Sequence, residues 1–221
     1  MKHREVVQAD ALSIAVQHKR CGLGISMGVG KTRIAIQHFQ RNYDPFIKAL
    51  VVIPKLSIKD SWIAELEKMN LSNLEFHLTF TTYLSINKHD PADYQLVYLD
   101  ECHSLLHNHK PFLSNFKGKI LGLTGTPPVR KGTEKYEMVS QYCPIRYRFT
   151  VDEATDSNIL NDYQIVVHEL LLAKTPTYKK KNKKGGQWYT SEYKDYMYVE
   201  SRFNDAVTPK QKQFSAIMRM R

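Results

Sequence analysis

The sequence is poor in cysteine, and its three cysteines lie far apart. Cys21, Cys102 and Cys143 are odd in number and form no C-x-x-C pair. This pattern gives no sign of a disulfide framework or of a zinc site, and it fits a reducing compartment.

Long apolar runs are absent as well. No segment approaches the roughly 20 apolar residues that a membrane-spanning helix needs. Residues 1–5 lead into a polar amphipathic stretch and not into the apolar core of a signal peptide. We therefore expect a cytoplasmic protein without a membrane partner.

Acidic residues are scarce relative to basic ones. The 221-residue chain has 32 lysines and arginines against 22 aspartates and glutamates, a formal net charge of +10. Such an excess favours a polyanionic partner, with nucleic acid ahead of a membrane surface. Charge that serves only solubility is the alternative, and composition alone does not separate the two.

One stretch carries a phosphate-binding pattern. The run I-S-M-G-V-G-K-T at 25–32 follows a short apolar segment and precedes residues with helical spacing, which is the context that a phosphate-binding loop needs. Gly28 and Gly30 permit a tight turn, Lys31 would reach the terminal phosphates, and Thr32 would ligate magnesium. The full pattern has glycine where this chain has Ile25, so the match is to the shorter form G-x-G-K-T. A glycine-rich turn that ends in a solvated lysine is the alternative.

Apolar runs of strand length alternate with segments of helical spacing. Residues 49–53, 96–99 and 120–123 are continuous apolar runs, typical of strands buried on both faces of a parallel sheet. Residues 4–19 have the spacing of an amphipathic helix. The alternation predicts an α/β domain with its functional residues at the carboxyl ends of the strands.

Two further elements are predicted between the first and the second of these strands. Ser57 offers a cap for a helix that carries Trp62. Residues 74–80 alternate in polarity and predict another strand.

Two adjacent carboxylates follow the apolar run at 96–99. Asp100 can hold a magnesium ion and Glu101 can polarise an attacking water, and these tasks need two carboxylates at one strand tip. A polar turn after a strand is the alternative, which the phosphate-binding pattern upstream argues against.

Four motifs in order resemble those of superfamily 2 helicases and translocases. They are M-G-V-G-K-T at 27–32, V-V-I-P-K at 51–55, D-E-C-H at 100–103 and L-T-G-T-P at 123–127. The resemblance is closest to DEAH/DExH-like and Swi/Snf-type members. It implies a RecA-like P-loop NTPase domain, with a mainly parallel central sheet flanked by helices, plus a C-terminal extension. It also implies ATP and Mg²⁺ as cofactors and DNA or RNA as the partner.

The resemblance implies roles for individual residues. The nucleotide would be bound by Gln8, Met27, Gly28, Val29, Gly30, Lys31 and Thr32. Magnesium would be held by Thr32 and Asp100, and catalysis would depend on Lys31 and Glu101. Coupling between the nucleotide and the nucleic acid would involve His103, Thr124 and Thr126. The nucleic-acid backbone would be contacted by Pro54, Lys55 and Thr82. Each role has a competing interpretation. Gln8 can be an exposed helical glutamine, and Pro54, Lys55 and Thr82 can belong to ordinary strand-exit loops. The hydroxyls of Thr124 and Thr126 can simply satisfy tight turns.

The second RecA-like lobe of this family is only begun in the sequence. We assign residues 1–150 to the ATP-binding first lobe and residues 151–221 to a connector and the start of an incomplete second lobe. Residues 165–172 are expected to be its first strand, and a helix is expected after Thr208. Because the second lobe supplies arginine fingers worth roughly 10³–10⁵ in rate, we expect weak ATP hydrolysis until a second lobe joins in cis or in trans.

The function expected is that of the ATP-binding motor lobe of a nucleic-acid-dependent ATPase, a helicase or translocase that acts on DNA more than on RNA. A nonhydrolytic nucleic-acid-binding or regulatory module made from one helicase lobe is one alternative, and the set Lys31, Asp100 and Glu101 argues against it. An unrelated P-loop ATPase that acts on protein is another, and the T-G-T-P turn argues against that one.

Residues 174–200 form a lysine- and tyrosine-rich segment around Gly185 and Gly186. Its lysines between 179 and 184 and its interleaved aromatic residues fit a nucleic-acid backbone and its bases. A solvated, flexible hairpin or loop is the other interpretation of such a charged run.

Overall fold

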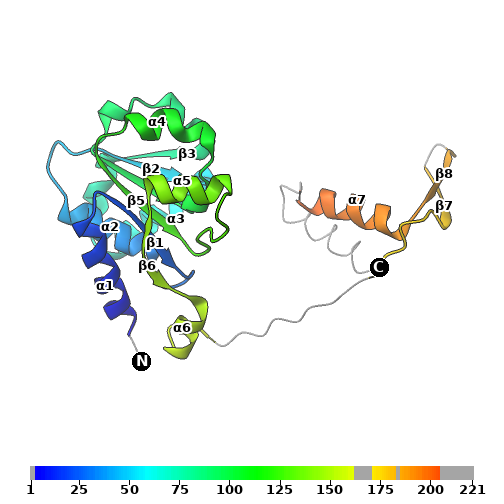
Figure 1. Cartoon of the computed structure of the whole chain (residues 1–221), viewed down its shortest axis with the longest axis horizontal. Helices are drawn as coiled ribbons and strands as arrows, with labels where there is room; N and C mark the ends of the chain where they lie inside the picture. The colour runs from blue at the N-terminus through cyan, green and yellow to red at the C-terminus, as the bar shows by residue number, and fades with distance from the viewer. Residues whose placement is uncertain (1–2, 162–170, 183–184, 205–221) are drawn as a thin grey trace. The chain divides into compact units, whose positions relative to one another are not determined.

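The computed structural model describes residues 3–161, 171–182 and 185–204, with no side-chain description for 201–204. The chain divides into two compact units, Met1–Tyr163 and Gln164–Arg221 (Figure 1). The domain boundary placed at residue 150 from the sequence stays a prediction.

The first unit is built on a six-stranded sheet in which every strand pairing is parallel. Its strands, in chain order, are β1 (Arg20–Ile25), β2 (Ala49–Ile53), β3 (Leu78–Thr82), β4 (Leu96–Asp100), β5 (Lys119–Thr124) and β6 (Ile145–Phe149). Across the sheet they run β3-β2-β4-β5-β1-β6. The strand of the phosphate loop and the strand of the acidic pair are thus separated by β5 alone, and all three end at the same edge.

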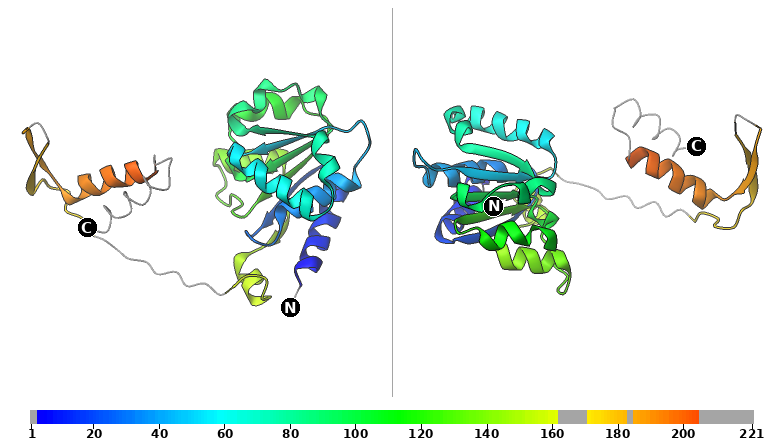
Figure 2. Two further views of the ribbon diagram at one scale, coloured as in Figure 1. Left: turned by 180° about the vertical axis from the view of Figure 1, so that it is seen from behind. Right: turned by 90° about the horizontal axis from the view of Figure 1, so that it is seen from above.

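Helices cover both faces of this sheet (Figure 2). The α-helices of the first unit are α1 (Arg4–Gln17), α2 (Lys31–Arg41), α3 (Lys59–Lys68), α4 (Lys110–Asn115), α5 (Glu134–Tyr142) and α6 (Val151–Asp156). Short 3-10 segments are η1 (Leu56–Ile58), η2 (Ser72–His77), η3 (Tyr83–Lys88), η4 (Pro91–Asp93), η5 (Cys102–Ser104) and η6 (His107–His109).

The alternation of side chains along β2 shows why the sheet is buried on both sides. Val51 and Ile53 pack into the core under α1, α2 and α3, whereas Leu50 and Val52 pack into the core under α4 and α5. Successive residues of a strand point to opposite faces, so a strand between two helical layers needs apolar residues at every position. Each such buried side chain contributes roughly 1.5–3 kcal/mol through the hydrophobic effect.

The α/β architecture predicted from the sequence is confirmed, with two local corrections. Ser57 does not cap the helix that carries Trp62: α3 begins at Lys59, and its N-cap residue Ile58 makes no side-chain cap hydrogen bond. Residues 74–77 belong to η2, and β3 begins only at Leu78. Leu74 is buried while Phe76 is 94% exposed, so the apolar alternation there does not mark one face of a strand.

The second unit contains a hairpin and a helix. Strands β7 (Tyr178–Lys181) and β8 (Gln187–Thr190) pair antiparallel, and α7 (Glu192–Asn204) follows. The predicted strand at 165–172 lies almost entirely outside the described residues, as does the helix predicted after Thr208. Among the helices that the structure describes, none has the length and apolar character needed to cross a bilayer.

Candidate nucleotide site

The loop between β1 and α2 has the backbone of a phosphate-binding turn. Gly28 and Gly30 adopt φ angles of +83° and +102°, a left-handed region that residues with side chains rarely adopt. Gly30 directly precedes α2, which begins with Lys31 and Thr32. The loop therefore presents the N-terminus of an 11-residue helix and its unpaired N–H groups, an arrangement that binds anions.

Gln8 of α1 supports this loop. Its side chain is buried, and its Nε2 donates a hydrogen bond to the carbonyl oxygen of Val29 at 2.7 Å. A Cβ atom on Gly30 would lie 2.5 Å from that Nε2, so glycine leaves the room that this bond needs. The structure thus gives Gln8 a contact with the loop, and its reading of adenine stays a prediction.

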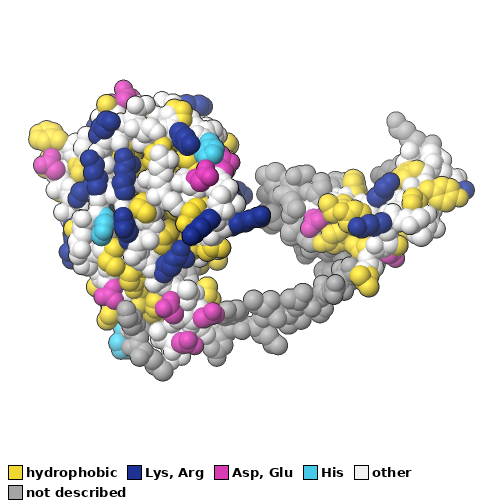
Figure 3. All heavy atoms as spheres, in the orientation of Figure 1, with side chains coloured by type: hydrophobic (Ala, Val, Ile, Leu, Met, Phe, Trp, Pro, Cys, Tyr) yellow, Lys and Arg dark blue, Asp and Glu magenta, His cyan; other side chains and the backbone are white. Residues whose placement is uncertain are grey.

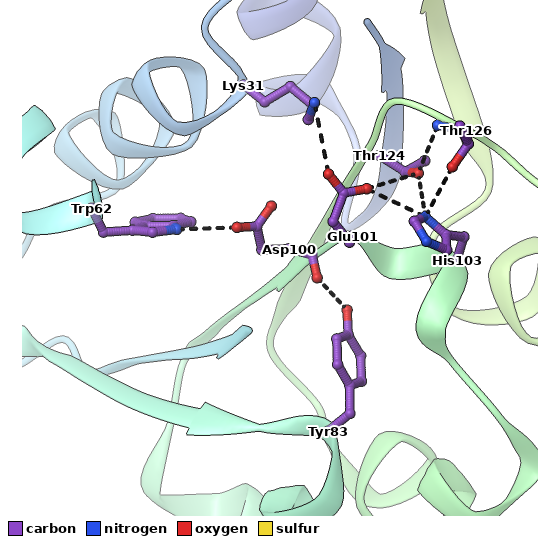
Figure 4. A network of polar contacts seen from close by, with 8 residues as sticks. All are labelled: Lys31, Trp62, Tyr83, Asp100, Glu101, His103, Thr124 and Thr126. Carbon is purple, nitrogen blue, oxygen red and sulfur yellow. Dashed lines mark hydrogen bonds and ion pairs between the residues drawn. The ribbon is translucent and has the colours of Figure 1, made fainter. Parts of the chain in front are cut away.

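The acidic pair lies where β4 ends. Asp100 is the last residue of the strand and is 8% exposed, and Glu101 takes the left-handed conformation with φ +52° and ψ +55°. A residue with a side chain is strained in this region, and such strain is concentrated at functional sites. The turn at Glu101 directs the two neighbouring carboxylates to different sides, with Asp100 toward α3 and Glu101 toward the phosphate loop (Figure 4).

Trp62 holds the Asp100 carboxylate, a contact that sequence reasoning missed. The indole Nε1 of Trp62 donates to Asp100 Oδ2 at 3.3 Å, and the Tyr83 hydroxyl donates to the Asp100 backbone carbonyl at 2.8 Å (Figure 4). Burial raises the pKa of Asp100; the charge of Glu101 raises it further, whereas the Trp62 hydrogen bond and the Lys31 charge lower it. The sequence placed Trp62 only on a predicted helix.

Lys31 and Glu101 face each other across the site. Lys31 Nζ lies 3.9 Å from Glu101 Oε1. The other oxygen, Oε2, accepts a hydrogen bond from the Thr124 hydroxyl at 3.4 Å and lies 3.3 Å from His103 Nδ1. Glu101 is therefore in contact both with the phosphate loop and with the end of β5.

The three predicted coupling residues contact one another (Figure 4). His103 Nδ1 lies 2.8 Å from Thr124 Oγ1 and 3.3 Å from Thr126 Oγ1. The Thr126 backbone N–H donates to Thr124 Oγ1 at 3.1 Å. These contacts connect the tips of β4 and β5, and two of the three side chains, those of His103 and Thr124, also contact Glu101.

An open pocket of about 540 Å³ brings together the predicted nucleotide-binding residues except Gln8 and Val29, and its volume is within the usual range of small-molecule sites. It is lined by Met27, Gly28, Gly30, Lys31, Thr32, Arg33, Ile58, Ser61, Ala64, Glu65, Lys68, Asp100 and Glu101. The Thr32 hydroxyl and the Asp100 carboxylate are oxygen ligands of the kind that Mg²⁺ prefers, while the loop and Lys31 suit phosphate oxygens. The residues present therefore fit a magnesium-bound nucleotide.

Arg33 is a second residue that sequence reasoning missed. It lines the same pocket, and its Nη1 lies 3.3 Å from Glu65 Oε1 of α3. This ion pair joins α2 to α3 across the pocket wall. An arginine next to the phosphate motif was visible in the sequence, but its partner on α3 was not.

The predicted nucleic-acid contacts lie outside this pocket, at the carboxyl ends of β2 and β3. Ile53 pairs with Thr82 in the sheet, so Pro54 and Lys55 come beside Thr82. Lys55 is exposed. The structure thus brings these three residues together at one edge, and their contact with phosphates stays a prediction.

The chain returns to the phosphate loop after α6. A Cβ atom on Gly28 would lie 2.8 Å from Leu160 Cδ2, and Arg4 donates a hydrogen bond to the carbonyl oxygen of Ile159 at 3.1 Å. Leu160 therefore packs against the loop itself. No local pattern in the sequence indicated this contact.

Solved structures of low sequence identity resemble the chain. A nuclease-deletion mutant of the Type ISP restriction-modification enzyme LlaGI, in complex with a DNA substrate mimic, is 17% identical with a TM-score of 0.50, covering 72% of this chain and 20% of that one. The Hef helicase domain of Pyrococcus furiosus is 18% identical with a TM-score of 0.49, covering 66% and 37%. The SWI2/SNF2 ATPase core domain of Sulfolobus solfataricus is 18% identical with a TM-score of 0.49, covering 100% and 56%. The chain thus spans between 20% and 56% of the length of these matches.

The likeness to LlaGI shows the fold alone. None of the curated proteins compared with the chain matches it. A protein-family model described as "Type III restriction enzyme, res subunit" matches residues 2–129, which is more than half of the chain. The family match, the ordered motifs and the parallel sheet confirm the resemblance stated from the sequence: the chain belongs to the type III restriction enzyme res subunit family and is a RecA-like lobe of the superfamily 2 helicase type.

Proposed function

We propose that this chain is the ATP-binding motor lobe of a nucleic-acid-dependent ATPase, a helicase or translocase that acts on DNA. The observation that carries the proposal is the shared pocket, in which Lys31, Asp100 and Glu101 converge from two separate strand ends. A strand-exit turn with no function in phosphate chemistry would not need all three in one pocket.

Each side chain has a distinct task in this proposal. The loop N–H groups and Lys31 would bind the phosphate oxygens, and Thr32 and Asp100 would hold Mg²⁺, which would neutralise charge on the phosphates. Lys31 then exchanges its Glu101 partner for the terminal phosphate. Glu101 orients a water molecule and accepts its proton, while His103 and Thr124 fix the carboxylate by the contacts of its second oxygen.

DNA and a second RecA-like lobe are the proposed partners. The formal net charge of +10 suits a polyanion, and the LlaGI structure contains a DNA substrate mimic. Pro54, Lys55 and Thr82 would contact the DNA backbone at the carboxyl edge of the sheet. A second lobe, in cis or in trans, would supply the arginine that this type of phosphoryl transfer uses.

Binding and turnover of ATP test the proposal. Lys31→Ala should weaken Mg-ATP binding about tenfold or more, since hydrogen bonds to charged groups contribute about 1.5–3 kcal/mol. Lys110→Ala, which removes an exposed lysine at the start of α4, is the matched control and should bind as the parent chain does. Calorimetry with and without Mg²⁺ measures both. Equal affinities in the parent chain and Lys31→Ala would refute the proposed site.

Turnover separates the motor from a binding module. With DNA and a second lobe present, Glu101→Gln should bind ATP normally and hydrolyse it about 10²–10⁴-fold more slowly, the range that a general base contributes. ATP binding with no turnover in the parent chain under the same conditions would instead favour a nonhydrolytic module.

A further inference from the structure

The hairpin of the second unit has two unlike faces. In its antiparallel register Lys179 lies opposite Tyr189, and Lys180 lies opposite Trp188. Directly opposed residues share a face of the ladder and neighbouring residues alternate. Lys179, Lys181 and Tyr189 therefore share one face, which we call the outer face, and Lys180 lies on the other, inner face.

The inner face is joined to α7 through Asp195. The Asp195 carboxylate pairs with Lys180 and accepts hydrogen bonds from the hydroxyls of Tyr178 and Thr190, the latter at 3.2 Å. Thr190 is 3% exposed. The Asp195 carboxylate is thus directed at the inner face, where it pairs with Lys180.

The outer face is cationic and carries an exposed ring. Tyr189 is 61% exposed, and Lys179 Nζ lies 4.9 Å from the centre of its ring. Lys179 and Lys181 are exposed. Residues 177–191 contain five lysines and no aspartate or glutamate, so the hairpin itself supplies no negative charge to this face. Lysine side chains lie beside hydrophobic ones on the face of the second unit seen in Figure 3.

We propose that this outer face binds single-stranded DNA, with Lys179 and Lys181 contacting phosphates and the ring of Tyr189 stacking on a base. Positive charge without compensating acid matches the phosphate backbone. The exposed ring selects a single strand, because only unpaired bases offer a free face for stacking. The choice of DNA rests on the proposed function, whereas the site itself is separate from the nucleotide pocket.

Binding of a labelled single-stranded oligonucleotide to the full chain, followed by fluorescence anisotropy without nucleotide, tests the outer face. The double variant Lys179→Ala, Lys181→Ala should weaken binding and reduce the slope of log K against log salt by about 1.4, since each phosphate contact on a single strand contributes about 0.7. Lys180→Ala, Lys194→Ala removes the same charge from the inner face and α7, and its slope should stay near that of the parent chain. Equal slopes for the two double variants would overturn the proposal.

Stacking has its own pair of variants. Tyr189→Ala should weaken binding about 5- to 150-fold, as loss of one base–aromatic stack does, and Tyr189→Phe should restore it. Circular dichroism of each variant confirms that the unit remains folded. Duplex DNA or single-stranded RNA that competes as well as single-stranded DNA would overturn the assignment. Variants that lose binding to phosphatidylserine vesicles but keep their affinity for single-stranded DNA would overturn it as well. Affinity for Mg-ATP tests the proposed function separately. The Lys31→Ala variant should lose affinity for Mg-ATP and keep the outer-face binding of DNA.

Discussion

At the scale of single residues, Trp62 and Asp100 show how a core side chain can serve a polar site. Trp62 is 1% exposed and packs edge-on against Phe80. Its one polar atom nevertheless reaches an oxygen of Asp100. The indole thereby fixes the orientation of the carboxylate and favours its charged form, which a metal ligand needs.

Trp62→Phe should therefore weaken magnesium-dependent ATP binding while keeping most of the core. Loss of the hydrogen bond raises the pKa of Asp100 further, since that bond is one of the contributions that lower it. We expect about tenfold weaker binding, with a larger loss at pH 6 than at pH 8. Titration with Mg²⁺ at both pH values measures this. Tyr83→Phe, which removes only the bond to the Asp100 backbone, is the control and should not change the pH dependence.

His38 provides a pH-dependent contribution to stability. It is 2% exposed, and its Nδ1 lies 2.9 Å from the Tyr98 hydroxyl. Burial, with a smaller effect of the Lys119 charge, lowers the pKa of His38 from 6.5 to about 4. Between these values protons bind the unfolded chain in preference to the folded one, so the free energy of unfolding falls as the pH falls, by about 3 kcal/mol in full.

Urea unfolding at pH 7 and at pH 5 measures this loss. His38→Gln cannot titrate, so its free energy of unfolding should fall less between the two pH values than that of the parent chain. An identical fall in both would show that other groups cause the acid sensitivity.

The sequence identified the candidate site where the chemistry is local. Gly28, Gly30 and Lys31 lie within one turn, and their residue types alone indicate a phosphate loop. Trp62 and Arg33 were missed because their contacts, with Asp100 and Glu65, are made between different elements. A contact across the fold leaves no spacing that a sequence pattern can show.

At the scale of elements, α1 and the phosphate loop are fitted to each other through Gln8 and Gly30. The loop needs φ +102° at Gly30, and the absence of a Cβ there leaves room for the Gln8 side chain. Conformational strain and steric contact thus act at the same position, and they can be separated by experiment.

Gly30→Ala should lower the free energy of unfolding by more than Gly132→Ala. Gly132 also has a positive φ, +77°, but a Cβ there would have no atom within 4 Å. Its substitution therefore reports the backbone strain alone, about 1–2 kcal/mol. Chemical denaturation of both variants measures the difference. Adding Gln8→Ala to Gly30→Ala should recover part of the extra loss, and no recovery would exclude the steric explanation.

Elements with a clear apolar pattern were predicted well from the sequence. The apolar run at 49–53 coincides with β2, and the helix expected at 4–19 is α1, Arg4–Gln17. Strand β6 was not predicted, because Arg146 and Arg148 interrupt its apolar residues at the edge of the sheet. The prediction of a strand was wrong for residues 74–77, because a 3-10 segment can also alternate in polarity.

At the scale of the whole molecule, the two units differ in what stabilises them. The first has a parallel sheet between two apolar cores. In the described part of the second, polar contacts to Asp195 join the hairpin and α7. A sequence reading could predict the first unit from its apolar runs, whereas the two faces of the lysine-rich segment became visible only in the register of β7 and β8.

Leu160 lies against Gly28 just before the first unit ends at Tyr163. Leu160 is therefore in the way of a backbone rearrangement around a bound phosphate. Such a rearrangement has to displace the Leu160 side chain or is resisted by it. We therefore expect a movement of the loop on nucleotide binding to be passed directly to Leu160 and its described neighbours.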